Sequence, residues 1–123
     1  MKVYIQTIQH EHQRYDTVGD WRQDPATDCL QIRVSDLGNE IEEFLIAVHE
    51  LVEAFACKVD GVSEESVDKF DMAYVGEEEP GDRLDAPYRR QHCLATGVER
   101  MLAAYFNIEW AEYEEHLDGL SKD

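Results

Sequence analysis

The chain has 123 residues, enough for one compact domain and too few for two ordinary ones, so residues 1–123 are expected to form a single domain. It carries 11 Lys and Arg against 28 Asp and Glu, a formal net charge of −17. This charge argues against direct binding to nucleic acids or anionic membranes and leaves cations and basic proteins as partners. The sequence contains no apolar run long enough for a membrane span and no signal-peptide pattern, and its 3 cysteines lack C-x-x-C spacing. A cytoplasmic protein with reduced thiols is therefore expected.

Alternating apolar residues in the N-terminal third predict a small antiparallel sheet. The expected strands lie at residues 3–8, 17–22 and 30–34. In the third of these, Leu30, Ile32 and Val34 share one side and should point into the core. Turn-forming residues at 24–28 predict that the second and third strands form a hairpin.

Helical spacing of apolar residues predicts three to four helices after the sheet. Their expected boundaries are 40–58, a start at Ser63, 88–106 and 108–117, with an exposed acidic loop at 76–87 and a flexible tail at 118–123. Asn39 and Glu42 form a capping-box pattern at the first of these helices, and Gly61 supplies its stop. The predicted class is α+β, with the sheet packed against the helices.

Two of the expected helices carry distinct apolar stripes. In the first helix the apolar residues fall at 41, 44, 45, 48, 51, 52 and 55, which predicts the buried face. The helix at 88–106 has two stripes, one of them formed by Leu94, Val98, Met101 and Tyr105. The second is formed by Tyr88, Ala95, Leu102 and Phe106, with His92 and Glu99 within it. A helix that is apolar on two sides is expected to be central and buried.

The first helix also carries the motif His49-Glu50-Leu51-Val52-Glu53. His49 and Glu53 are four residues apart, so their side chains lie one turn apart on the same face. This is the spacing of the zinc-binding H-E-x-x-H motif, with a carboxylate in place of the second histidine. The pattern therefore predicts a metal site in which Glu50 is the general base.

A catalytic zinc takes three protein ligands, and two histidines with one glutamate are a common set. His92 is the best source of the missing imidazole, because it lies on an otherwise apolar stripe. Glu99, two turns later on that stripe, is predicted either as a fourth ligand or as a partner that orients an imidazole. The predicted site is therefore metal-bound His49, Glu53, His92 and Glu99, although a plain His–Glu hydrogen-bond network would satisfy the same buried groups.

The order of a small sheet followed by a helix with His-Glu-x-x-Glu resembles the minimal zincin-like core of small metallopeptidases. The segment at 44–61, together with the stretch at 86–100, also resembles a set of small phage and prophage proteins, and that likeness implies no particular activity. The zincin resemblance implies a strand, a motif helix and a later helix that brings the third ligand. The sequence departs from that pattern at Glu53, where zincins carry histidine.

The predicted function is a divalent-metal-binding protein, most simply a zinc-dependent, peptidase-like hydrolase acting on a peptide or small carbonyl substrate. One alternative is a Mg²⁺-dependent nucleoside-triphosphate pyrophosphohydrolase that uses the two E-x-x-E pairs formed by Glu40, Glu43, Glu50 and Glu53. Another is an acidic, non-enzymatic phage-type decoy that occupies a nucleic-acid-binding partner.

Overall fold

The computed structural model describes residues 1–76 and 78–120 of the chain. Within these residues the strands are β1 (Lys2–Ile8), β2 (Gly19–Asp24) and β3 (Cys29–Ser35). The α-helices are α1 (Glu40–Asp60), α2 (Glu64–Ala73), α3 (Arg89–Tyr105) and α4 (Trp110–Leu120). Two short 3-10 helices, η1 (His10–His12) and η2 (Pro80–Asp82), lie in the connections. The predicted α+β class, a small N-terminal sheet packed against helices, is confirmed.

The sheet is mixed, with the strand order β1–β3–β2. β2 and β3 form the expected antiparallel hairpin, with Trp21 opposite Ile32. β1 differs from the expectation because it runs parallel to β3, with Ile5 opposite Ile32. The chain reverses once between β1 and β2 and once more in the hairpin, so β1 and β3 point the same way and pair along the free edge of β3.

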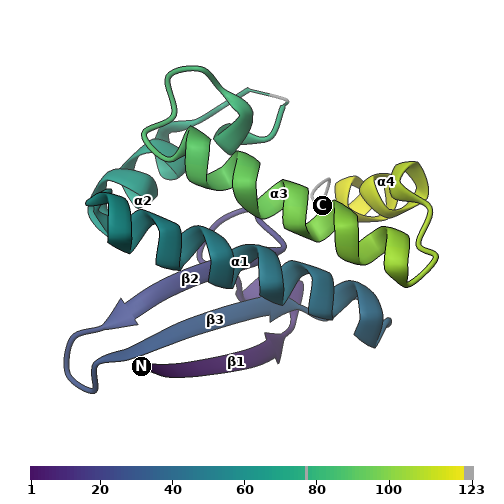
Figure 1. Cartoon of the computed structure of the whole chain (residues 1–123), viewed down its shortest axis with the longest axis horizontal. Coiled ribbons are helices and arrows are strands. Elements are labelled where there is room, and N and C mark those ends of the chain that lie inside the picture. The colour runs from purple at the N-terminus through teal and green to yellow at the C-terminus, as the bar shows by residue number, and fades with distance from the viewer. Residues whose placement is uncertain (77, 121–123) are drawn as a thin grey trace.

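Helix α1 lies between the sheet and α3, and α3 runs antiparallel to it (Figure 1). Asn39 caps α1 as predicted, since its side-chain oxygen accepts hydrogen bonds from the backbone N–H groups of Ile41 and Glu42. Gly61 ends the helix with a φ of 73°, a conformation that favours glycine. The Glu42 side chain does not return to the cap, because its carboxylate accepts a hydrogen bond of 2.8 Å from His116 instead.

The core between α1 and the sheet contains the predicted inward side of β3. Leu30, Ile32 and Val34 are all buried there. Leu45 and Cys57 of α1 are fully buried against this layer. The β2–β3 hairpin and α1 therefore pack against each other. The first residues of β2 lie next to the polar face of α1.

The buried face of α1 is not the apolar stripe that the spacing predicts. Phe44 and Phe55 of that stripe are 48% and 49% exposed. His49, Glu50 and Glu53 are instead among the buried residues of the helix. Apolar spacing misplaced the buried face because polar side chains that satisfy one another can be buried at modest cost.

Helix α3 is buried on one side rather than on two. His92, Ala95 and Glu99 of the second predicted stripe are buried against α1. Met101 and Tyr105 of the other stripe are 67% and 79% exposed. The expectation of a centrally buried helix is therefore wrong, because α1, η2 and α4 pack on α3 and leave its other side exposed.

The loop before α3 and the C-terminal end of the chain can be compared with the expected acidic loop and tail. The expected acidic loop at 76–87 contains η2, in which Gly81 is buried, although most of its described residues are exposed. The predicted tail at 118–123 begins as the last turn of α4, and residues 121–123 and Glu77 lie outside the described residues. None of the described helices has the length and apolar character needed to cross a membrane.

Candidate metal centre

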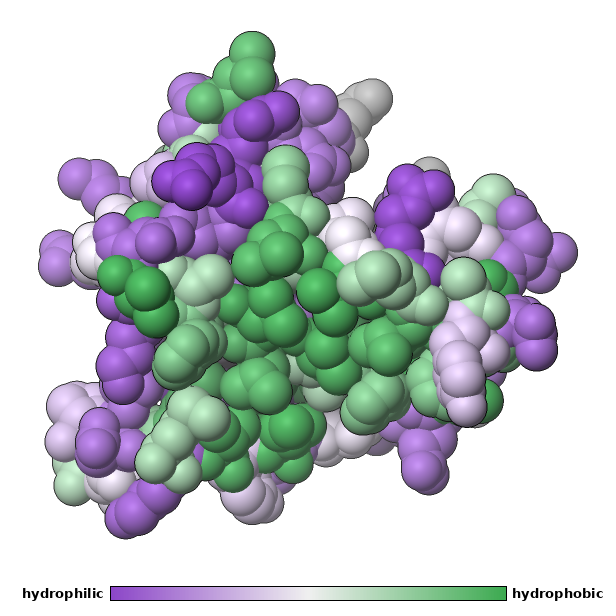
Figure 2. Space-filling view, viewed as in Figure 1, coloured by the Kyte–Doolittle hydropathy of each residue, from purple (hydrophilic) through white to green (hydrophobic). Residues whose placement is uncertain are grey.

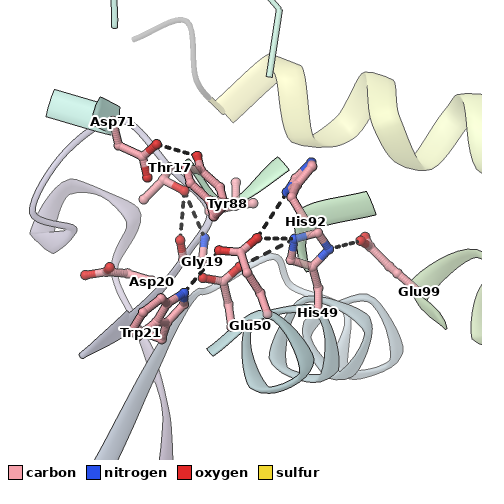
Figure 3. Close-up of polar contacts among 12 residues, drawn as sticks. Thr17, Gly19, Asp20, Trp21, His49, Glu50, Asp71, Tyr88, His92 and Glu99 are labelled. Carbon is pink, nitrogen blue, oxygen red and sulfur yellow. Dashed lines mark hydrogen bonds and ion pairs between the residues drawn. The ribbon is translucent and has the colours of Figure 1, made fainter. Parts of the chain in front are cut away.

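Three residues predicted as metal ligands meet between α1 and α3. His49 and Glu53 lie on successive turns of α1. His92 comes from the first turn of α3, and its ring lies against the ring of His49 (Figure 3). All three side chains are buried, at 8%, 5% and 5% exposure. One nitrogen or oxygen atom from each lies within 4.8 Å of the others.

The distances test whether these atoms fit a single cation. Glu53 Oε2 lies 3.3 Å from His49 Nε2 and 3.1 Å from His92 Nδ1. Two atoms bound at about 2.1 Å to one tetrahedral ion lie about 3.4 Å apart, so the observed spacing is close to that of a ligand set. The three residues and Glu50 line a cavity of about 30 Å³, which is room for one ion or water molecule. The cluster could therefore hold a divalent metal.

Each imidazole contacts a further carboxylate through its other nitrogen. His49 Nδ1 lies 2.7 Å from Glu99 Oε1, and His92 Nε2 lies 3.3 Å from Asp82 Oδ1. Such contacts fix the tautomer and the orientation of a metal-binding histidine and increase its basicity. Glu99 thus lies behind His49 and outside the His49–Glu53–His92 group, because two helical turns separate it from His92 by about 10 Å along α3.

Two more side chains hold the carboxylates of the cluster in place. Trp21 Nε1 donates a hydrogen bond of 3.0 Å to Glu53 Oε1, and the Tyr113 hydroxyl donates one of 2.6 Å to Glu99 Oε2. No local sequence pattern marks Asp82, Trp21 or Tyr113 for these roles. They come from η2, β2 and α4, and only the packing of these elements around α1 and α3 brings them together.

The cluster shifts the proton affinities of its members in opposite directions. Burial alone would raise the pKa of Glu53, but hydrogen bonds from His49 and His92 outweigh it and lower that pKa to about 2. Burial alone would lower the pKa of His49, but its hydrogen bonds to Glu53 and Glu99 raise it well above the usual value. The pKa of His92 is also raised, since the hydrogen bond to Glu53 outweighs burial. Without a metal, the rings therefore hold their protons more tightly than ordinary histidines do.

Glu50 is a carboxylate of the cavity wall that contacts His49 and belongs to none of the side-chain hydrogen bonds described above. It is 9% exposed, and its Oε2 lies 3.9 Å from His49 Nε2. Burial, and then the charge of Glu53, raise the pKa of Glu50 well above its usual value. A buried carboxylate with raised proton affinity next to a metal-sized cavity is suited to accept and donate a proton.

Two glycines allow the surrounding segments to approach the cluster. A Cβ atom at Gly81 would overlap the ring of His92, so a glycine is needed where η2 brings Asp82 onto that ring. A Cβ atom at Gly19 would lie 2.9 Å from Glu50 Cγ, closer than real Cβ contacts. The sequence shows these glycines but not the close approach that explains them.

A groove of about 650 Å³ leads from the cluster to the surface between α4, β2 and the segment that joins α2 to α3. Its lining is strongly acidic, with carboxylates from Asp16, Glu50, Asp71, Glu78, Glu79, Asp82, Glu99, Glu114 and Asp118. Lysine and arginine are absent from its described lining residues. The groove therefore presents a negative field to anything that approaches the cluster.

The two E-x-x-E pairs of α1 do not come together as a carboxylate cluster. Glu40 is exposed at the start of the helix, and Glu43 accepts a hydrogen bond of 2.8 Å from the backbone N–H of Leu37. Of these four glutamates, Glu50 and Glu53 line the cavity and the other two do not. The arrangement required by the pyrophosphohydrolase alternative is thus not formed by these glutamates.

Comparison with known proteins leaves the site to be interpreted from its own geometry. No family model matches the chain, and no curated protein or solved structure matches it significantly. The fold and the cluster define an α+β protein with a buried His-Glu-His group that could hold a divalent cation.

Proposed function

We propose that this protein is a metal-dependent hydrolase in which His49, Glu53 and His92 hold zinc or another divalent cation. The observation that carries the proposal is the convergence of these three side chains within 4.8 Å in a buried position. Two histidines and one glutamate are a ligand set of catalytic zinc sites, which leave the fourth position for water. In this proposal the sheet, α1 and α3 form a zincin-like core in which Glu53 replaces the second histidine.

Glu50 is proposed as the general base. A bound divalent cation would lower the pKa of a coordinated water towards about 7 and polarise the substrate carbonyl. Glu50 then accepts a proton from the attacking water as the new carbon–oxygen bond forms. It returns that proton to the leaving amine as the carbon–nitrogen bond breaks, so no other reactant is needed. Its raised pKa, caused by burial and by Glu53, favours this proton transfer.

The acidic groove indicates the class of substrate. Carboxylates line the approach to the cluster, and lysine and arginine do not occur among its described lining residues. A peptide or small amide with lysine, arginine or a free amine would therefore be concentrated there, whereas an acidic substrate would be repelled. We propose basic peptides as the substrate class.

The test is hydrolysis by defined metal-loaded forms of the protein. The chain is stripped with a chelator, reloaded with zinc, manganese or cobalt, and assayed with quenched peptides that are either rich in lysine and arginine or rich in aspartate and glutamate. The expected result is metal-dependent cleavage that prefers the basic peptides. Glu50→Gln should abolish cleavage while the metal affinity remains.

Glu40→Gln is the matched control, because it removes the same charge from an exposed position of α1 outside the groove. It should cleave like the wild type. If no metal supports cleavage of any peptide, or if Glu50→Gln is fully active, the hydrolase proposal fails even when the metal binds.

A further inference from the structure

The exposed sides of α1 and α3 form a continuous apolar face. Figure 2 shows it as a hydrophobic area across the middle of the view in which α1 and α3 lie at the front of Figure 1. This apolar face comprises Phe44, Val48, Leu51 and Phe55 of α1 and Leu94, Val98, Met101 and Tyr105 of α3. Its exposure is high for a chain that carries 28 acidic residues, and exposed apolar areas of this kind mark association surfaces.

We propose that the apolar face binds a second copy of this chain in an antiparallel, two-fold symmetric dimer. The apolar residues of this face are spaced symmetrically along α1. Phe44 and Phe55 are equally distant from the midpoint between His49 and Glu50, and so are Val48 and Leu51. A stripe with this symmetry matches its own copy when the copy runs in the opposite direction, as a two-fold interface requires.

The apolar stripe of α3 has the same symmetry. Leu94 and Tyr105 are equally distant from the midpoint between Glu99 and Arg100, and so are Val98 and Met101. A two-fold axis that crosses α3 at this midpoint pairs a large side chain with a large side chain at both ends.

One axis can serve both helices only if the two midpoints lie side by side. They do, because His49 Nδ1 and Glu99 Oε1 are 2.7 Å apart. A two-fold axis that lies in the interface and crosses both helices at this contact therefore packs α1 against α1 of the partner subunit. It likewise packs α3 against α3 of the partner subunit. The metal cluster lies on the opposite side of α1 from the apolar face, so the dimer leaves the cluster and its groove free.

Charges at the ends of the apolar face favour a second copy over an unrelated partner. On α1 the exposed Glu40 lies beyond one end of the stripe and the exposed Lys58 beyond the other. The rotation brings Lys58 next to Glu40 of the partner subunit. These opposite charges offset part of the repulsion between two chains of net charge −17.

The first test is the mass in solution, measured by light scattering and sedimentation for the full chain. The wild type should be a dimer, and Phe55→Lys and Met101→Lys should be folded monomers by circular dichroism. Met72→Lys is the matched control, because Met72 is 57% exposed on α2 and lies outside the apolar face. A monomeric wild type at every soluble concentration overturns the proposal, and so does a dimer that survives both face variants.

The second test exchanges the charges at positions 40 and 58. Rescue of the dimer by this exchange is specific to the antiparallel arrangement. Lys58→Glu or Glu40→Lys alone places two like-charge pairs in the dimer and should weaken it about tenfold. Mixing the two variants, or combining both changes in one chain, should restore the wild-type dissociation constant. If neither the mixture nor the combined variant recovers, the antiparallel dimer is wrong, and a dimer of another geometry or another partner occupies the face.

Discussion

His49 of α1 and Glu99 of α3 are 50 residues apart in the chain and are joined by a buried hydrogen bond of 2.7 Å. The Tyr113 hydroxyl donates to the other oxygen of the same carboxylate, so α4 is attached at the same point. This contact orients the imidazole towards Glu53 and sets the register of α1 against α3. The geometry of the candidate metal centre therefore depends on a residue that does not belong to the ligand group.

Glu99→Gln tests that dependence. A glutamine keeps the size of the side chain but removes the charge that favours a proton on His49 Nδ1, so the ring is held less firmly with Nε2 towards the centre. We expect the zinc affinity to fall by about 10- to 100-fold with little change in fold. Calorimetric titration of zinc measures this, with Glu115→Gln, at an exposed position of α4 outside the groove, as the matched control. An unchanged affinity in Glu99→Gln would contradict the positioning role.

Metal affinity should increase with pH. The pKa values of His49 and His92 are raised because their hydrogen bonds to carboxylates outweigh the effect of burial. A metal must displace those protons, so binding is weaker in acid and stronger above the raised pKa values. Titration in two buffers with different ionisation enthalpies should show proton release on zinc binding. Binding without proton release, with equal affinity at pH values of about 6 and 8, contradicts this explanation.

Above a pH of about 6.5, the stability of the metal-free protein should fall as the pH rises. A histidine with a raised folded-state pKa contributes stability below its unfolded pKa of about 6.5 and loses it as the pH rises through the folded value. Glu50 acts in the same direction, since burial raises its pKa and its charged form is disfavoured in the folded state. Urea unfolding at several pH values measures the trend. Glu50→Gln should flatten it, and a wild type that becomes more stable in alkali would be inconsistent with the shifts.

Gly81→Ala should disturb the cluster from outside. The added Cβ atom would overlap the ring of His92, so either η2 or the ring must move. We expect a loss of about 1–3 kcal/mol in the free energy of unfolding and a weaker zinc affinity. Gly119→Ala in α4 is the control, because a Cβ atom there meets no neighbour within 4 Å. Equal stability and affinity of the two variants would show that η2 does not constrain His92.

The sequence predicted the order and type of the main elements because these depend on local signals. The alternation in β3, the Asn39 cap and the Gly61 stop all appear in the structure where the pattern indicates them. His49, Glu53 and His92 were found because helical spacing and the cost of burying polar groups are visible in a single chain. The metal identity and the hydrolytic activity stay predictions.

What the sequence could not provide are contacts between distant elements. The parallel pairing of β1 with β3 depends on the path between strands, and the position of Glu99 behind His49 depends on how α3 crosses α1. Apolar spacing alone does not identify the buried face of α1, because Phe44 and Phe55 are about half exposed. His49, Glu50 and Glu53 are buried instead, and their partners come from other elements that the spacing within one helix does not reveal.

The most direct test of the account is a zinc titration of the metal-stripped, untagged protein, followed by calorimetry and metal analysis. The account predicts one ion per chain in the wild type, and loss of that ion in His92→Ala and in Glu53→Ala while both variants keep the wild-type helix content. Absence of stoichiometric binding, or binding that survives in His92→Ala, would contradict it, because His49, Glu53 and His92 would then be only a hydrogen-bond network.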